Sequence, residues 1–261
     1  MNNILFEGKV GDISNLGLLQ FVPNDEIANN YLKSSFYLRD ATYYRESETR
    51  TQNDLKADET EGVSKNWSIL ENSFFISCYT FLDSDDFDDG GKIKDSVVEN
   101  LERDNYNHGK LCPRPFITIK DANVNCLLTR LCWEIYSYTQ CHNLKSSGFF
   151  FKPILYLSED KYLAEEERIE SKIIEYSGKV DKSNLKKMDL SKDRDENLKP
   201  ILRFLYLTKL NKYSPQKEYR AGVAFDDPLE VGELNVPVSD LSNYVRAHQA
   251  SEICNLSIEN L

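Results

Sequence analysis

PFITIKDANVNCLLTRLCWEIYSY, residues 115–138, is the stretch that decides the fold class. Its first five residues are mostly aromatic or β-branched, which is typical of a strand. From Asp121 onward, apolar residues recur every three or four positions, so residues 121–138 are predicted to form a helix with Asp121 as its N-cap. The apolar face of this helix, expected to lie in the core, consists of Val124, Leu127, Leu128, Leu131, Ile135 and Tyr138.

The same reading extends outward along the chain. Further segments rich in aromatic and β-branched residues are predicted as strands: 18–22, 35–39, 73–81, 149–157, 202–208 and 218–225. A second long helix is predicted over 158–176, with an apolar stripe made of Leu163, Ile169, Ile173 and Ile174. Shorter helices are predicted at 25–33, 94–104 and 239–247. Because strands and helices do not alternate strictly, we predict an α+β fold with a mixed or antiparallel sheet and packed helices.

The length and composition favour one domain. The chain has 261 residues, of which 40% are hydrophobic, so it can bury a substantial core. Charged residues cluster and apolar residues thin out at 45–66, 83–95 and 177–199. We interpret these stretches as polar loop insertions in a single domain over 1–261, and the aspartate-rich one at 83–95 as a mobile acidic loop.

The net charge and the lack of a targeting or membrane-span pattern indicate which classes of partner to expect. Lys and Arg total 32 against 43 Asp and Glu, a formal net charge of −11, which disfavours a broad grip on nucleic acid or on an anionic membrane. The N-terminus shows no basic start followed by an apolar run, and no stretch has about 20 apolar residues, as a membrane span needs. The sequence therefore predicts a cytoplasmic protein whose partner is a small molecule or another protein.

The cysteines and histidines indicate neither a disulfide framework nor a metal site. The six cysteines form no CxxC pair, and without a secretion signal we expect them to be reduced and mostly buried. Cys141 and His142 are adjacent, but the other two histidines lie far along the chain. No metal site is predicted, because zinc needs further ligands at suitable spacing.

Two polar clusters are candidate sites. In the first, Tyr44, Arg45 and Glu46 follow a predicted strand, and Asp58 and Glu61 come after a polar loop. Aromatic hydroxyls, a guanidinium and several carboxylates are the groups that clamp a phosphate or a sugar. The alternative is a solvated loop with surface ion pairs of little energetic worth.

The second cluster is KYSPQKEYR, residues 212–220, which leads into an apolar strand. Side chains alternate along a strand, so Gln216, Glu218 and Arg220 are predicted to project from one face. Such a triple forms either an exposed sheet face or the wall of a site.

Taken in order, these polar segments resemble the bacterial domain of unknown function numbered 2971. The landmarks are the segments YRESE (44–48), DETEG (58–62), FFISCYT (74–80), HGKLCPRPFITIKD (108–121) and YSPQKEYR (213–220). The chain departs from the family before the first strand, where many members have a His-Tyr element. The family transfers no activity, but orphan proteins of this kind are often found among bacterial mobile-element and phage-defence genes.

The resemblance implies that the two clusters converge on one cleft. Arg45 and Arg220 would bind an anion there, and Glu46, Glu61 and Glu218 would act as acid/base or bracing groups. An equal alternative is a buried ion-pair network that fixes the fold.

Three function classes remain open. The order of an early Arg39 or Arg45, then Ser77 with Thr80, then Gln216-Lys217-Glu218 is similar to the Arg, Ser and Gln-x-Glu pattern of ADP-ribosyltransferases, which act on NAD. In such an enzyme Ser77 orders the pocket, Glu218 stabilises an oxocarbenium-like ribose and Gln216 positions the acceptor. The first alternative is a non-enzymatic ligand-binding module or accessory subunit of a defence system. The second is a nuclease, which is weakened by the missing metal motif and by the negative charge.

Overall fold

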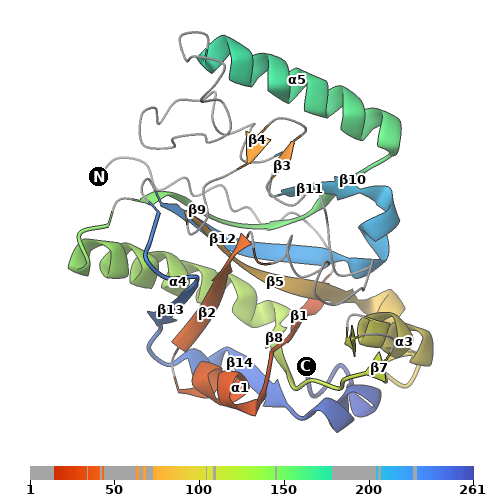
Figure 1. Cartoon of the computed structure of the whole chain (residues 1–261). Helices are drawn as coiled ribbons and strands as arrows, with labels where there is room; N and C mark the ends of the chain where they lie inside the picture. Colours follow the sequence, from red (N-terminus) through yellow and green to blue (C-terminus); the bar gives the residue numbers. More distant parts are fainter. Residues whose placement is uncertain are drawn as a thin grey trace.

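The computed structural model describes a set of segments that covers most of the chain, namely residues 15–33, 35–41, 43, 63–64, 67–68, 73–103, 105–107, 110–144, 146–177, 204, 207–225 and 228–261. The longer helices are α1 (Asp25–Leu32), α3 (Asp95–Arg103), α4 (Asp121–Cys141) and α5 (Glu159–Ser177). The strands of the main sheet are β1 (Asn15–Phe21), β2 (Ser35–Asp40), β5 (Phe74–Asp83), β8 (Phe116–Lys120), β9 (Ser146–Pro153), β12 (Glu218–Phe225), β13 (Glu233–Pro237) and β14 (Val245–His248). Helices and sheet together confirm the predicted α+β class (Figure 1).

All described pairings in this sheet are antiparallel. The order is β13-β2-β5-β1-β8-β14, and β12 pairs with both β5 and β9. Smaller two-stranded pieces are β3 (Val63–Ser64) with β4 (Trp67–Ser68), β6 (Tyr106–Asn107) with β7 (Lys110–Leu111), and the parallel pair β10 (Leu155–Leu157) with β11 (Thr208–Leu210).

The sheet forks at β5. Strand β12 pairs with residues 74–80 of β5, so it occupies one edge of β5 along most of its length. On the other edge, β2 pairs at Phe75 and Ile76, whereas β1 pairs from Thr80 to Asp83. Two strands therefore share a single edge of β5, and the side chains between them fill the fork.

Helix α4 covers one face of the forked sheet (Figure 1). It contacts β1, β8, β9 and β13, and its buried side chains pack against apolar residues from all the central strands. The predicted apolar face is buried at Val124, Leu127, Leu128, Leu131 and Ile135 and half-buried at Tyr138. This large core holds β5 and β12 rigidly, because interiors are packed as densely as organic crystals.

The opposite face carries two structures. Around β1 and β8, a second core joins Leu19 and Phe116 to α3 and to the 3-10 helix η4 (Ala250–Asn255). Around β5 and β12, the pair β10 and β11 and helix α5 lie above the sheet (Figure 1). The candidate site described below lies between these two structures.

Several predicted elements are wrong or shifted. Residues 239–247 are not a helix: Leu241–Asn243 is a short 3-10 helix, η3, and β14 begins at Val245 because it pairs with β8. In the predicted strand 202–208, Phe204 and Leu207 are helical, and β11 begins only at Thr208. The N-cap of α4 is Lys120, and Asp121 is the first residue of the helix.

The stripe predicted for α5 is also partly wrong. Leu163 is exposed, whereas Tyr162 and Ile169 are buried. The side chains of Ile173 and Ile174 lie outside the described part of the structure. The helix therefore packs through a face rotated from the predicted one.

The segment 83–95, predicted as a mobile acidic loop, contains a 3-10 helix and a β-bridge and is joined by ion pairs to Lys217, the residue before β12. Asp83 caps the 3-10 helix η1 (Ser84–Asp86), and Lys217 binds the carboxylates of Asp83 and Asp86 at 3.0 and 2.7 Å. Phe87 and Ile93 form a β-bridge and are buried in the second core. The described residues of the other two predicted insertions are Val63 and Ser64 in β3 and Ser177 at the end of α5.

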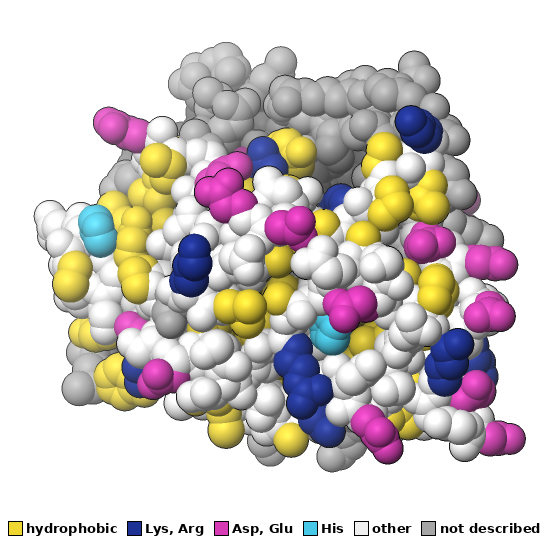
Figure 2. Space-filling model, turned by 90° about the horizontal axis from the view of Figure 1, so that it is seen from below, with side chains coloured by type: hydrophobic (Ala, Val, Ile, Leu, Met, Phe, Trp, Pro, Cys, Tyr) yellow, Lys and Arg dark blue, Asp and Glu magenta, His cyan; other side chains and the backbone are white. Residues whose placement is uncertain are grey.

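The prediction that the cysteines are mostly buried is wrong. Cys112, Cys126, Cys141 and Cys254 are exposed, and Cys78 and Cys132 are half-buried. Acidic, basic and apolar side chains are interspersed on the face shown in Figure 2. Within the described ranges, none of the helices combines the length and the apolar character needed to cross a membrane.

Candidate functional site

The second polar cluster lies where a 3-10 helix meets β12. Residues Asn211–Gln216 form this 3-10 helix, η2, and Lys217 then adopts a left-handed conformation with φ 44°. Strand β12 begins at Glu218. The predicted alternation therefore holds for Glu218 and Arg220, whereas Gln216 belongs to η2 and does not share their strand face.

Glu218 is the centre of a buried ion-pair cluster. One carboxylate oxygen accepts from Nζ of Lys209 at 2.8 Å, and the other accepts from Nε of Arg220. Glu218, Lys209 and Arg220 are only 7, 5 and 2% exposed. Lys209 also donates to Oε1 of Gln216 at 3.3 Å, and the backbone N–H of Glu218 donates to the hydroxyl of Tyr156 at 2.9 Å.

The electrostatics of the cluster follow from this geometry. Burial alone would raise the pKa of Glu218, but the charges and hydrogen bonds of Arg220 and Lys209 outweigh it and hold the pKa well below its usual range. Burial, reinforced by the carboxylate of Glu218, raises the pKa of Tyr156. Glu218 is therefore ionised, and both of its oxygens are engaged.

Ser77 does not join this cluster. Facing residues of an antiparallel pair share one face of the sheet, and Ser77 faces Ala221 while Thr80 faces Glu218. Because side chains alternate along a strand, Ser77 lies on the face opposite Glu218. Thr80, at the same level as Glu218, occupies the place that the predicted Ser77 role requires.

Ser77 instead belongs to a polar network that fills the fork of the sheet. It accepts from Nε2 of Gln20 at 2.8 Å and donates to the hydroxyl of Tyr79 at 3.3 Å. The hydroxyl of Tyr31 donates to Oε1 of Gln20 at 2.9 Å. Burial raises the pKa of Tyr31 to about 12, so the network is uncharged.

Substituting Ser77 by alanine should lower the free energy of unfolding by about 1–3 kcal/mol, because the buried Nε2 of Gln20 loses its acceptor. Urea denaturation of the variant measures this loss. Ligand binding on the opposite face should not change, and a selective loss of activity without a loss of stability would contradict the structural role.

The first polar cluster cannot be placed relative to the second. Tyr44, Arg45, Glu46, Asp58 and Glu61 all lie outside the described residues, so their predicted convergence with Glu218 stays a prediction.

Arg39, the alternative early arginine, lies on β2. Its guanidinium stacks 3.3 Å from the ring centroid of Tyr43 and pairs with Glu233 of β13 at 3.5 Å.

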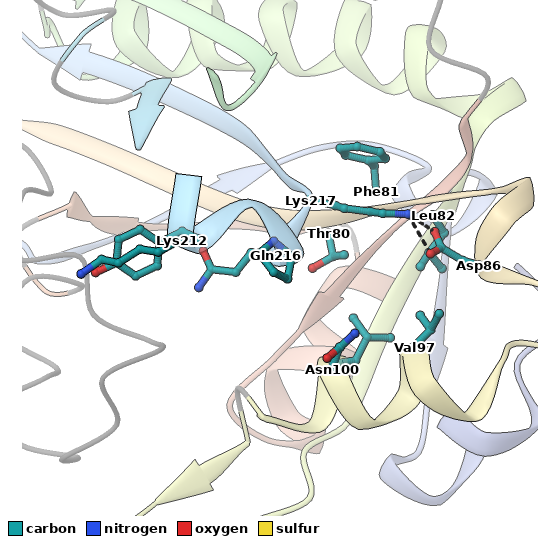
Figure 3. Close-up of a pocket in the computed structure, with 12 residues that line it drawn as sticks. Thr80, Phe81, Leu82, Asp86, Val97, Asn100, Lys212, Gln216 and Lys217 are labelled. Carbon is teal, nitrogen blue, oxygen red and sulfur yellow. Dashed lines mark hydrogen bonds and ion pairs between the residues drawn. The ribbon is translucent and has the colours of Figure 1, made fainter. Parts of the chain in front are cut away.

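A cavity of about 260 Å³ opens beside the ion-pair cluster, between η2 and α3 (Figure 3). Its walls come from the end of β5, from η1, from α3 and from η2. The lining residues are Thr80, Phe81, Leu82, Asp86, Val97, Asn100, Leu101, Lys212, Tyr213, Pro215, Gln216 and Lys217. Of the residues predicted to act in catalysis, Gln216 reaches this cavity.

The ion pair between Lys217 and Asp86 lies at one end of the cavity, and Lys212 lies at the other (Figure 3). Lys217 is fixed by Asp83 and Asp86; burial lowers its pKa, but the hydrogen bonds and charges of these two carboxylates outweigh burial and raise it. Lys212 lies over the ring of Tyr213 with Nζ 4.8 Å from the centroid. Between the two lysines, Thr80 and Gln216 present neutral polar groups.

Sequence reasoning missed the α3 wall of the cavity. Asn100 and Val97 lie in a segment that reads as an ordinary amphipathic helix, and nothing in the sequence links them to Lys212 or Tyr213. The η2 side lies in KYSPQKEYR, residues 212–220, which the sequence did single out as a polar cluster. In the part of the chain that the structure describes, no three His, Cys, Asp or Glu side chains gather as metal ligands would.

Comparison with known proteins finds no relative of this chain. No family model, no curated protein and no solved structure matches the chain.

Proposed function

We propose that the protein is a ligand-binding module that holds a small molecule in the cavity between η2 and α3. The observation that carries the proposal is the cavity itself, with largely apolar walls, charged groups at its two ends and neutral polar groups of Thr80, Asn100 and Gln216 between them (Figure 3). A concave, mainly apolar site with a small number of orienting polar groups is the usual form of a small-molecule site.

The ion pairs around the cavity support this role by fixing its walls. The Glu218 cluster ties the end of η2 to the start of β12 through Lys209 and Gln216. Lys217 ties the same turn to η1 through Asp86. A wall held in this way loses little freedom when a ligand binds, which favours affinity.

In this proposal Glu218 and Arg220 are positioning residues. Both oxygens of Glu218 are engaged by cations, and Glu218 and Arg220 are nearly inaccessible to solvent. A carboxylate held in this way braces the wall of a site rather than contacting the ligand.

The proposal is tested by filling the cavity. Val97→Phe places a ring in the cavity from the α3 wall, and Val231→Phe, at a half-exposed valine elsewhere, is the matched control. Indole, benzamide, adenosine and uridine are titrated while thermal unfolding is followed. At least one of these compounds should raise the Tm of the wild type and of Val231→Phe but not of Val97→Phe. Failure of all four to shift the wild type would contradict the proposal.

An ADP-ribosyltransferase activity on NAD is the second candidate. It is favoured by the position of Gln216, which lines the cavity two residues before Glu218 at the start of β12. The activity requires Glu218 to leave its ion pairs when NAD binds. Nicotinamide release by the wild type, lost in Glu218→Gln under conditions where that variant is folded, would support it. If the protein turns over no NAD with any of several acceptors, the ADP-ribosyltransferase candidate is wrong.

The accessory role in a defence system and the nuclease alternative both stay predictions. A nuclease should cleave DNA or RNA with Mg²⁺ or Mn²⁺, and the absence of cleavage with both ions would count against this alternative.

A further inference from the structure

We infer that the cavity takes a neutral compound with a flat ring and an amide-like edge, the class to which nucleobases and nucleosides belong. This inference rests on the proposed function, because it names the occupant of the same site.

The walls select a ring. Tyr213 on η2 contributes an aromatic side chain, and Pro215 adds a rigid apolar surface, whereas the ring of Phe81 points to the opposite face of the sheet (Figure 3). Leu82, Val97 and Leu101 close the remaining apolar surface. Aromatic side chains bind flat rings by stacking, and every nucleobase can stack because each has a flat π-face.

The polar groups select the edge of the ring. Asn100 and Gln216 carry carboxamides, and Thr80 carries a hydroxyl that can donate and accept. Carboxamides offer a donor beside an acceptor, the pattern that pairs with the edge of adenine. Lys209 already donates to Oε1 of Gln216, which orients that amide, and the exposed side chain of Asn100 lines the cavity from α3.

The charges disfavour an anion. The ammonium of Lys217 is held by two carboxylates, Asp83 and Asp86, so this end of the cavity offers no excess positive charge. In the same segment Asp85, Asp88, Asp89 and Asp95 outnumber Lys92 and Lys94, so its further net charge is negative. Lys212 lies at the opposite end, beyond Thr80 and Gln216 (Figure 3). A phosphate would therefore be repelled at one end of the cavity, and a neutral ligand meets no such cost.

Calorimetric titration of the full chain tests the class. Adenosine, uridine and benzamide are the amide-edged probes, indole is an apolar ring of similar size, and adenosine monophosphate adds an anion. We expect the amide-edged probes to bind more tightly than indole and adenosine to bind at least as tightly as its monophosphate.

Asn100→Ala and Thr80→Val should each weaken the amide-edged probes about three- to tenfold, the loss of one hydrogen bond, and leave indole unchanged. Asn29→Ala is the matched control, because Asn29 is likewise exposed on a helix, α1, away from the cavity. It should change none of the affinities.

The outcomes separate the two proposals. If indole binds and the amide-edged probes do not, or if both variants bind those probes as the wild type does, the ligand class is wrong and the cavity remains a binding site. If the monophosphate binds much more tightly than adenosine, the inference of neutrality is wrong. If no probe binds, the proposed function fails together with the inference.

Discussion

Replacing Glu218 by alanine should lower the free energy of unfolding by about 3–5 kcal/mol, the loss seen when one partner of a buried ion pair is removed. The variant leaves Lys209 and Arg220 buried with like charges and without the carboxylate that both of them bind. Urea denaturation followed by circular dichroism measures the loss.

The matched control is Glu165→Ala. Glu165 pairs with Arg168 on the outer surface of α5, where both side chains are substantially exposed. Surface pairs of this kind contribute about 1 kcal/mol or less. A loss for Glu218→Ala as small as for the control would show that water reaches the cluster, and would favour a catalytic role for Glu218.

The same cluster makes stability depend on pH in a defined direction. The folded-state pKa of Glu218 is held below its ordinary value of 4.5 by Arg220 and Lys209, although burial alone would raise it. Its stabilising contribution is therefore complete above about pH 4.5 and is lost as the pH falls toward the folded-state pKa. Below about pH 4.5, the wild type should lose stability on acidification more steeply than Glu218→Gln.

Gly222→Ala should lower the free energy of unfolding by about 1–3 kcal/mol through overpacking. A Cβ at this position would lie 2.4 Å from Cζ of Phe150, which faces Gly222 across the β9–β12 ladder. The ring of Phe150 also stacks on Phe74 of β5 with centroids 5.5 Å apart, so it cannot move without losing that contact. Thermal unfolding of the variant measures the loss.

A double variant provides the control. Removing the ring in Phe150→Ala eliminates the clash, so Gly222→Ala should cost much less in that background than in the wild type. Gly90→Ala, in an exposed turn, should change stability by no more than about 0.5 kcal/mol. Strict additivity of Phe150→Ala and Gly222→Ala would contradict the proposed contact.

The elements that could be predicted are those whose pattern is strong and local. Strand β12 occupies the predicted residues 218–225. Helix α4 buries the predicted stripe, because apolar residues spaced three and four positions apart fall on one face of a helix. The segments 233–237 and 245–248 form strands because β2 and β8 pair with them. Which strands pair is decided by tertiary structure, and the strand propensity of a short segment does not reveal its partner.

The site was harder to predict because it depends on register and faces. The sequence places Ser77 and Glu218 on strands, but their separation on opposite faces follows from the pairing of Ser77 with Ala221. A shift of one residue would have brought Ser77 to the Glu218 face. The left-handed Lys217 likewise ends the strand alternation before Gln216, and its ion pairs with Asp83 and Asp86 join segments more than a hundred residues apart.

The fork at β5 also has a consequence for how the chain reaches this structure. The partners of β5 are β1 and β2, which are synthesised before it, and β12, which follows more than a hundred residues later. At the usual rates of translation, one edge of β5 waits roughly ten seconds for β12, with SFFISCYTF exposed as an aggregation-prone template. Pairings of such long range raise the contact order and slow folding. We therefore expect slow refolding in vitro, and yields during expression that rise at low temperature or with added chaperones.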